Sequence, residues 1–424
     1  MNTKQLLSIT SLALLLALAP VHATDTILHN FAGGSSDCAQ PFYSAAVTLS
    51  GTKLYGLTSR GGSSDLGTVF SVNTNGSGFT LLHGFTGGVG DGLSPFGAPV
   101  LSGAKLYGMT VRGGSSNLGT IFTTNTDGSG YTLLHSFMDS VSDGILPYGS
   151  LTLGGAKLYG ITNAGGTGGN GTAFSMNTDG TGFALLHSFI GGASDGLAGF
   201  GSLTLSGTKL YGMTVGGGSG SRGTVFSMNL NGTGFTLLHH FAGGSGDGDD
   251  PQGSLTLSGT KIYGMTAGGG SFNFGTAFSM NIDGTGFTLL RSFSGNLNDG
   301  HSPNGALTLS GTKLYGMTSS GGPSSGGVAF SMNTNGTGFA VMHNFTGLPG
   351  DGSVPLGTLT LSADGASLYG MTPYGGTANQ GTIFSLPIGV PEPASAGLLA
   401  LGALLFSTAR RGPRLEPRFR NEGF

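Results

Sequence analysis

The sequence predicts an all-β protein: a seven-bladed β-propeller of four-stranded antiparallel blades, with an N-terminal strand closing the last blade. A Tyr-Gly step recurs about every 52 residues, at Tyr55, Tyr107, Tyr159, Tyr211, Tyr263, Tyr315 and Tyr369. Each repeat contains four short segments rich in Thr, Phe, Leu and Val, separated by Gly-rich connections, and four-stranded units repeated around a ring are typical of propellers. One copy of the segment that ends each repeat also stands alone near the N-terminus.

The fourth repeat illustrates the elements expected in every blade. Its strands are predicted at residues 202–205, 210–214, 224–229 and 235–241. The Gly-containing connections at 206–207 and 231–234 are short enough for hairpin turns, whereas those at 216–222 and 242–253 are long loops. Glycine interrupts every possible helical pattern, so no helix is expected.

The chain ends are offset in a way that suits a closed ring. Residues 26–31 repeat the segment that ends the other units, and the last unit stops at residue 386 without one. The N-terminal segment can therefore complete the last blade and remove the free edges of the ring. A β-solenoid is the alternative fold, but it has no use for this offset.

Composition excludes several classes of protein. The 424 residues include 86 Gly and only 8% charged residues, yet 27 Phe and 11 Tyr recur at fixed positions, which excludes collagen and simple disorder. Between residues 24 and 390 there are sixteen Asp and no Glu against ten Lys and Arg, so no nucleic-acid-binding surface is expected. Cys38 is the single cysteine and permits no internal disulfide.

The N-terminus has the pattern of a secretory signal peptide. Residues 1–23 contain Lys4, an apolar run over 12–19, and small residues at the end, which predicts cleavage between Ala23 and Thr24. The protein is therefore expected to be exported.

The C-terminal residues 390–411 contain Pro391, Glu392 and Pro393, then an uncharged apolar stretch, then Arg410 and Arg411. This arrangement resembles the PEP-CTERM sorting signal of bacteria with an outer membrane. The resemblance implies a short transmembrane segment that anchors the chain transiently in the inner membrane, with its positive end in the cytoplasm. It also implies cleavage by an exosortase-type enzyme and transfer to the cell surface or extracellular matrix. Residues 412–424 add a Pro/Arg-containing cytoplasmic tail, longer than such signals usually have.

The repeats over residues 24–389 carry the motifs L-Y-G-x-T, x-G-G, G-T-x-F and L-x-x-F in that order. In this they resemble the choice-of-anchor tandem repeat family called GloVer. The resemblance implies an exported bacterial surface protein with interchangeable C-terminal anchors, and it implies no assigned activity.

Each repeat has one Asp in the long loop that leads to the next unit. These residues are Asp37, Asp91, Asp143, Asp195, Asp247, Asp299 and Asp351. Because both long loops should emerge on one face, the carboxylates could ring the mouth of the central channel and bind a cation such as calcium. Alternatively, each Asp organises its own turn by accepting hydrogen bonds from nearby backbone N–H groups. No other cofactor is expected.

Five residues after this Asp, the first four repeats carry an aromatic residue. These are Phe42, Phe96, Tyr148 and Phe200, whereas the remaining repeats have Gln252, Asn304 and Leu356. They are candidate ligand-binding residues, because an aromatic crescent on an uncharged face can stack on sugars or peptides. The alternative is that the rings are plugs beneath the loops.

Two other repeated sets are interpreted as structural. His29, His83, His135, His187, His239 and His343 share one position in the outermost strand, with Arg291 in the remaining unit. They should lie on the perimeter, too far apart to share a metal ion. Lys53 and its equivalents 105, 157, 209, 261 and 313 should form a solvated ring beside the short turns.

Catalysis has little support in the sequence. Glycoside hydrolysis needs two carboxylates at a defined separation. Because residues 24–390 contain no Glu, both would have to be Asp, and most Asp residues are repeat copies. The most irregular region, residues 246–301, contains Asp249, Asp250, Arg291 and His301 and is where an enzyme site would be expected. We therefore expect a non-catalytic surface or matrix protein that binds polysaccharide or a protein partner through its long-loop face. A secreted carbohydrate-active enzyme is the alternative.

Overall fold

The computed structural model describes residues 25–42 and 45–389. The signal-peptide cleavage site and the C-terminal sorting signal lie outside these residues. Strands are the only regular elements of the described chain, and none of its segments is a helix capable of crossing a membrane. The described residues up to Pro387 belong to one compact unit.

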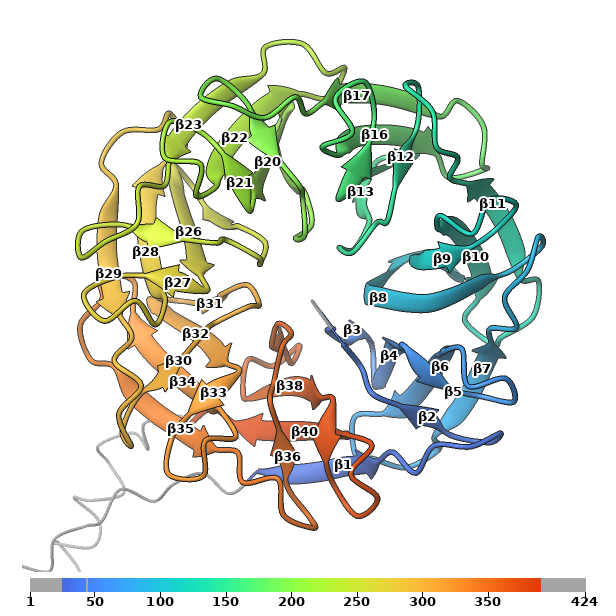
Figure 1. Cartoon of the computed structure of the whole chain (residues 1–424). Coiled ribbons are helices and arrows are strands. Elements are labelled where there is room, and N and C mark those ends of the chain that lie inside the picture. Colours follow the sequence, from blue (N-terminus) through green and yellow to red (C-terminus); the bar gives the residue numbers. More distant parts are fainter. Residues whose placement is uncertain (1–24, 43–44, 390–424) are drawn as a thin grey trace, which may run out of the picture. The chain divides into compact units, whose positions relative to one another are not determined.

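Seven antiparallel four-stranded sheets form a ring, which confirms the predicted seven-bladed propeller (Figure 1). From the inner to the outer strand, the sheets are: blade 1, β3 (Thr48–Ser50), β4 (Lys53–Thr58), β6 (Thr68–Asn73), β7 (Thr80–Gly84); blade 2, β8 (Gly92–Ser102), β9 (Lys105–Gly113), β10 (Thr120–Asn125), β11 (Thr132–Ser136); blade 3, β13 (Thr152–Gly154), β14 (Lys157–Ile161), β16 (Thr172–Asn177), β17 (Ala184–Ser188); blade 4, β19 (Thr204–Ser206), β20 (Lys209–Thr214), β22 (Thr224–Asn229), β23 (Thr236–His240); blade 5, β25 (Thr256–Ser258), β26 (Lys261–Thr266), β28 (Thr276–Asn281), β29 (Thr288–Ser292); blade 6, β31 (Thr308–Ser310), β32 (Lys313–Thr318), β34 (Val328–Asn333), β35 (Ala340–Asn344); and blade 7, β37 (Thr360–Leu361), β38 (Ser367–Thr372), β40 (Thr382–Pro387), β1 (Thr26–Asn30).

The long loops contain an element that the sequence pattern did not predict. In six blades, two residues of one long loop pair with two residues of the other, so both loops of a blade emerge on the same side. The pairs are β2 (Cys38–Ala39) with β5 (Arg60–Gly61), β12 (Gly144–Ile145) with β15 (Ala164–Gly165), β18 (Gly196–Leu197) with β21 (Gly216–Gly217), β24 (Gly248–Asp249) with β27 (Gly268–Gly269), β30 (Gly300–His301) with β33 (Ser320–Gly321), and β36 (Gly352–Ser353) with β39 (Tyr374–Gly375). In blade 2 the corresponding pairing, Gly92 with Gly113, is continuous with β8 and β9.

The ring closes as predicted, because β1 pairs antiparallel with β40 from Thr26 opposite Ser385 to Asn30 opposite Thr382. The adjoining Phe31 is fully buried and meets Phe70 of blade 1 with 5.6 Å between ring centroids. The first residues of the described chain therefore complete the last blade and pack against the first.

The hydrophobic core lies between blades. One cluster, for example, combines Tyr159, Ile161 and Phe189 of blade 3 with Leu210 and Phe226 of blade 4. A single blade would expose half of such a cluster, so each repeat depends on its neighbours for stability.

The Tyr-Gly step is explained by packing across each sheet. Gly160 pairs directly with Phe174, and a Cβ on Gly160 would lie 2.3 Å from Phe174 Cζ. The absent side chain leaves room for the phenylalanine ring to lie over the strand.

Neighbouring blades are also joined near the axis. The Thr204 hydroxyl donates a hydrogen bond of 2.8 Å to the Leu255 carbonyl of the next blade, and Thr360 likewise donates to Val47 across the closure, at 2.6 Å. A Cβ on Gly149 would lie 2.4 Å from the carbonyl oxygen of Gly201 in the next blade, so glycine permits this close approach.

Candidate functional site

The predicted aromatic residues form a strip across adjacent blades. Phe96 lies in β8, while Tyr148 and Phe200 lie between the long-loop ladder and the inner strand of blades 3 and 4. Tyr148 stacks on Phe96, with centroids 5.6 Å apart and planes at 19°, and on Phe200, at 4.8 Å and 16°. The structure therefore brings three of the four predicted rings together in one row.

Phe42 extends the strip in the other direction. Its ring contacts Tyr374 of β39 edge to face, with centroids 5.6 Å apart. Phe42 and Phe96 also line one cavity of about 290 Å³ between blades 1 and 2. We call Tyr374, Phe42, Phe96, Tyr148 and Phe200 the aromatic strip; all five are half-buried, so each has both a packed and an exposed part.

Polar groups accompany the aromatic strip in blade 1. Arg60 and Asp65 line the same cavity, and Arg60 Nη1 lies 3.0 Å from Asp65 Oδ2. Both side chains are 57% exposed, so they can contact a ligand. They also line a second cavity of about 410 Å³, together with Gln40 and Gln380. Blade 1 thus combines hollows, an exposed ion pair and aromatic rings.

The repeated aspartates do not ring the channel, so that predicted placement is wrong. The Asp91 carboxylate instead accepts a 3.2 Å hydrogen bond from His83 Nε2 on the outermost strand, and backbone N–H bonds from Thr86 and Gly92. We call this pair the His–Asp brace, and it recurs in His29–Asp37, His135–Asp143, His187–Asp195, His239–Asp247 and His343–Asp351, with Arg291–Asp299 replacing it once. The turn-organising interpretation matches this geometry, since hydrogen-bond donors occupy both carboxylate oxygens.

The histidines hold adjacent blades together. The His83 ring stacks on Tyr131 of the following blade, with centroids 3.9 Å apart and planes 4° from parallel. Arg291 takes the same position, with its guanidinium carbon 3.7 Å from the centre of the Phe339 ring. Each brace therefore links a long loop, an outer strand and the next blade.

The braces predict acid sensitivity. Burial favours the neutral form of Asp91, but hydrogen bonds from His83 and Thr86 outweigh it and lower the pKa to about 2. An unfolded Asp has a pKa of about 3.9, so the brace contributes its full stability above about pH 4 and loses it as the pH falls toward 2. We expect the melting temperature to fall over this range, and the Asp91→Asn variant to show a smaller fall. Identical pH profiles for the two proteins would contradict this role.

The irregular region of blades 5 and 6 does not form a convergent catalytic group. Asp249 pairs with Arg222, and Asp250 accepts a 2.8 Å bond from Gln252. Arg291 is engaged by Asp299 at 2.8 Å, whereas His301 contacts Phe274, with ring centroids 5.0 Å apart. Burial raises the pKa of Asp250, but no second predicted catalytic group is bonded to it.

Sequence reasoning missed the brace and part of the strip. The constant spacing of eight residues between each His and its Asp was a usable signal, because it also holds for Arg291 and Asp299. Tyr374, Arg60 and Asp65 belong to loops that vary between repeats, so no periodic signal marked them.

The family model described as Gloeobacter/Verrucomicrobia repeat matches residues 12–221 and 200–391. None of the curated proteins matches the chain. Among solved structures, an oligogalacturonate lyase in complex with manganese is similar at a TM-score of 0.54 and 13% identity, covering 88% of this chain and 97% of that one. TolB from Acinetobacter baumannii is similar at a TM-score of 0.40 and 13% identity, covering 65% and 59%. At such identities the likeness concerns the fold alone.

Proposed function

Because the chain belongs to the Gloeobacter/Verrucomicrobia repeat family, we propose that it is an exported, non-catalytic propeller that binds polysaccharide through the aromatic strip. The two predicted sorting signals support export to the cell surface or extracellular matrix, with an exosortase-type enzyme as processing partner. The single observation that carries the binding proposal is the row of half-buried rings on adjacent blades beside the cavity between blades 1 and 2.

The chemistry of the strip favours sugar over other ligands. Aromatic rings present flat apolar surfaces, and the C–H faces of sugar rings pack against such surfaces, while hydroxyl groups need polar partners nearby. Arg60 and Asp65 supply those partners in the cavity that Phe42 and Phe96 line. A row of rings across several blades suits an extended polymer better than a single sugar.

The binding test is a pair of substitutions in the strip. In the Phe96→Ser/Tyr148→Ser variant, we expect retention on an insoluble or gel-embedded polysaccharide to fall at least about tenfold, which corresponds to about 1.4 kcal/mol. The far-ultraviolet circular dichroism spectrum should remain unchanged. Phe272→Ser is the matched control, because Phe272 is 57% exposed in a loop of blade 5 and is not part of the strip.

The same polysaccharide panel distinguishes the alternatives. Retention without shortening of the polymer supports a binding protein, whereas shortened products would establish a carbohydrate-active enzyme. Unfolding of the double variant would show that the rings are plugs. No retention by the unaltered protein on any polysaccharide would contradict the proposal and favour a protein partner.

A further inference from the structure

One joint between blades departs from the repeat. At six joints, the His or Arg of the brace stacks on an aromatic residue of the next blade, namely Phe79, Tyr131, Phe183, Phe235, Phe287 or Phe339. At the joint between blade 6 and blade 7, the corresponding position is Asp25, immediately before β1. The aromatic contact is therefore replaced by a carboxylate where the ring closes.

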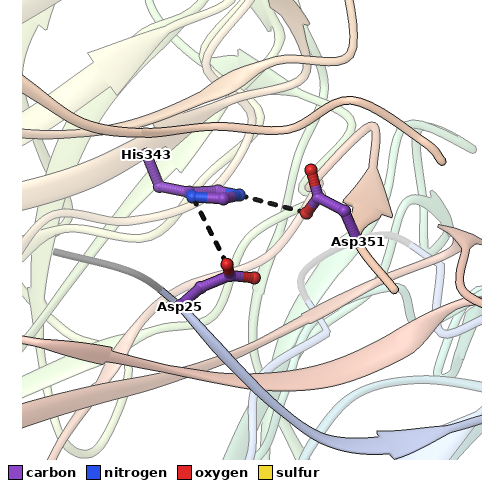
Figure 2. A group of neighbouring side chains, drawn as sticks. All are labelled: Asp25, His343 and Asp351. Carbon is purple, nitrogen blue, oxygen red and sulfur yellow. Dashed lines mark hydrogen bonds and ion pairs between the residues drawn. The ribbon is translucent and has the colours of Figure 1, made fainter. Parts of the chain in front are cut away.

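The imidazole of His343 consequently lies between two carboxylates (Figure 2). His343 Nε2 is 3.0 Å from Asp351 Oδ1, and His343 Nδ1 is 3.7 Å from Asp25 Oδ1. Among the described residues, only Asp25, His343 and Asp351 bring three potential metal ligands within 4.8 Å of one another.

Hydrogen bonding fixes the orientation of the His343 ring. Asp351 accepts hydrogen bonds from the backbone of Gly352 and from the backbone and hydroxyl of Thr346. Because its two oxygens act as acceptors in these bonds, the 3.0 Å contact with His343 is a hydrogen bond that Nε2 donates. The other ring nitrogen, Nδ1, therefore faces Asp25.

The Asp25 carboxylate lacks hydrogen-bond partners at this joint. Its Oδ2 is buried and has no partner among the described residues. Its Oδ1 faces His343 Nδ1 across 3.7 Å. That separation exceeds a hydrogen bond of about 2.7–3.2 Å, but two metal–ligand bonds of about 2.0–2.2 Å can span it.

We propose that Asp25 and His343 Nδ1 bind a zinc ion that fastens the N-terminal strand to blade 6, with Asp351 orienting the imidazole. A metal-bound histidine commonly donates its other N–H to a carboxylate, as His343 does to Asp351. Imidazole with carboxylate suits zinc, whereas calcium prefers oxygen ligands alone. Water completes the coordination, and binding stabilises the folded ring by mass action.

The test measures the melting temperature of the full-length protein after removal of metal by EDTA and dialysis. Added Zn²⁺ should raise the melting temperature with saturation at one equivalent, and an equal concentration of Ca²⁺ should not. Replacing Zn²⁺ with Co²⁺ should give a visible absorption band. Asp25→Asn should weaken zinc affinity at least about tenfold. Asp179→Asn is the control, because equivalent repeats carry Asn75, Asn231 and Asn335 at this exposed turn position.

Asp25→Phe provides a second variant that should fold, since it restores the aromatic residue of the other joints. We expect it to lose the zinc response and to melt higher than the metal-free unaltered protein. An equal zinc response in Asp25→Asn would overturn the proposal. A second result would also overturn it: the melting temperature of the unaltered protein does not respond to Zn²⁺ but rises on acidification, and this rise depends on Asp25. The cation at this joint would then be a proton.

Discussion

Deletion of residues 26–31 is expected to abolish cooperative folding of the propeller. The deletion removes β1, leaves β40 as a free edge, and removes Phe31, which is fully buried between the last blade and the first. Loss of one buried Phe side chain alone costs about 3–5 kcal/mol. Since whole domains are stable by only about 5–15 kcal/mol, we expect partial unfolding and aggregation through the exposed edge. Thermal melting and size-exclusion chromatography measure both effects.

A rearranged chain separates the role of the strand from that of its position. In this variant, residues 26–31 are inserted after Pro387 through a copy of residues 282–287, which connect β28 to β29 in blade 5. The closing strand would then reach β40 by an ordinary hairpin, and cooperative melting should return. A deletion variant that melts like the unaltered protein would contradict the closure argument, as would a rearranged chain that fails to recover.

Gly160→Ala is expected to destabilise the protein by about 1–3 kcal/mol, the usual cost of overpacking. The new Cβ would lie 2.3 Å from Cζ of Phe174, which is fully buried and cannot move into solvent. Denaturant unfolding should show a lower midpoint with an unchanged slope. Gly246→Ala is the matched control, because a Cβ there meets nothing within 4 Å and its φ is not in the left-handed region.

The double variant Gly160→Ala/Phe174→Leu tests the proposed cause. Leucine lacks the far end of the phenylalanine ring, so part of the clash should disappear and the two effects should be less than additive. A coupling free energy of about 0.5–3 kcal/mol is expected for residues in contact. Strict additivity would mean that Gly160 is required for another reason.

Periodic features were predictable from the sequence, whereas features built from the variable loops were not. The Tyr-Gly spacing and the isolated N-terminal segment predicted seven blades and their closure, and the structure confirms both. Phe96, Tyr148 and Phe200 could be placed on one face, but their stacking depends on distances between blades. The prediction that the repeated aspartates ring the channel was wrong, because a position in a loop does not fix whether a side chain turns toward the channel or the perimeter.

The sequence by itself determined the number of blades, the order of strands and the way in which the ring closes, because backbone pairing follows the alternation of strand and turn residues. Only the tertiary structure decided which side chains from different repeats meet: the brace histidines with the aromatic residues of the next blade, the aromatic strip with Arg60 and Asp65, and the Asp25–His343–Asp351 group. The physical reason is that these contacts cross between blades or between loops. Their geometry depends on how the repeats pack against one another. The sequence of a single repeat does not specify which side chains of the next repeat it will contact.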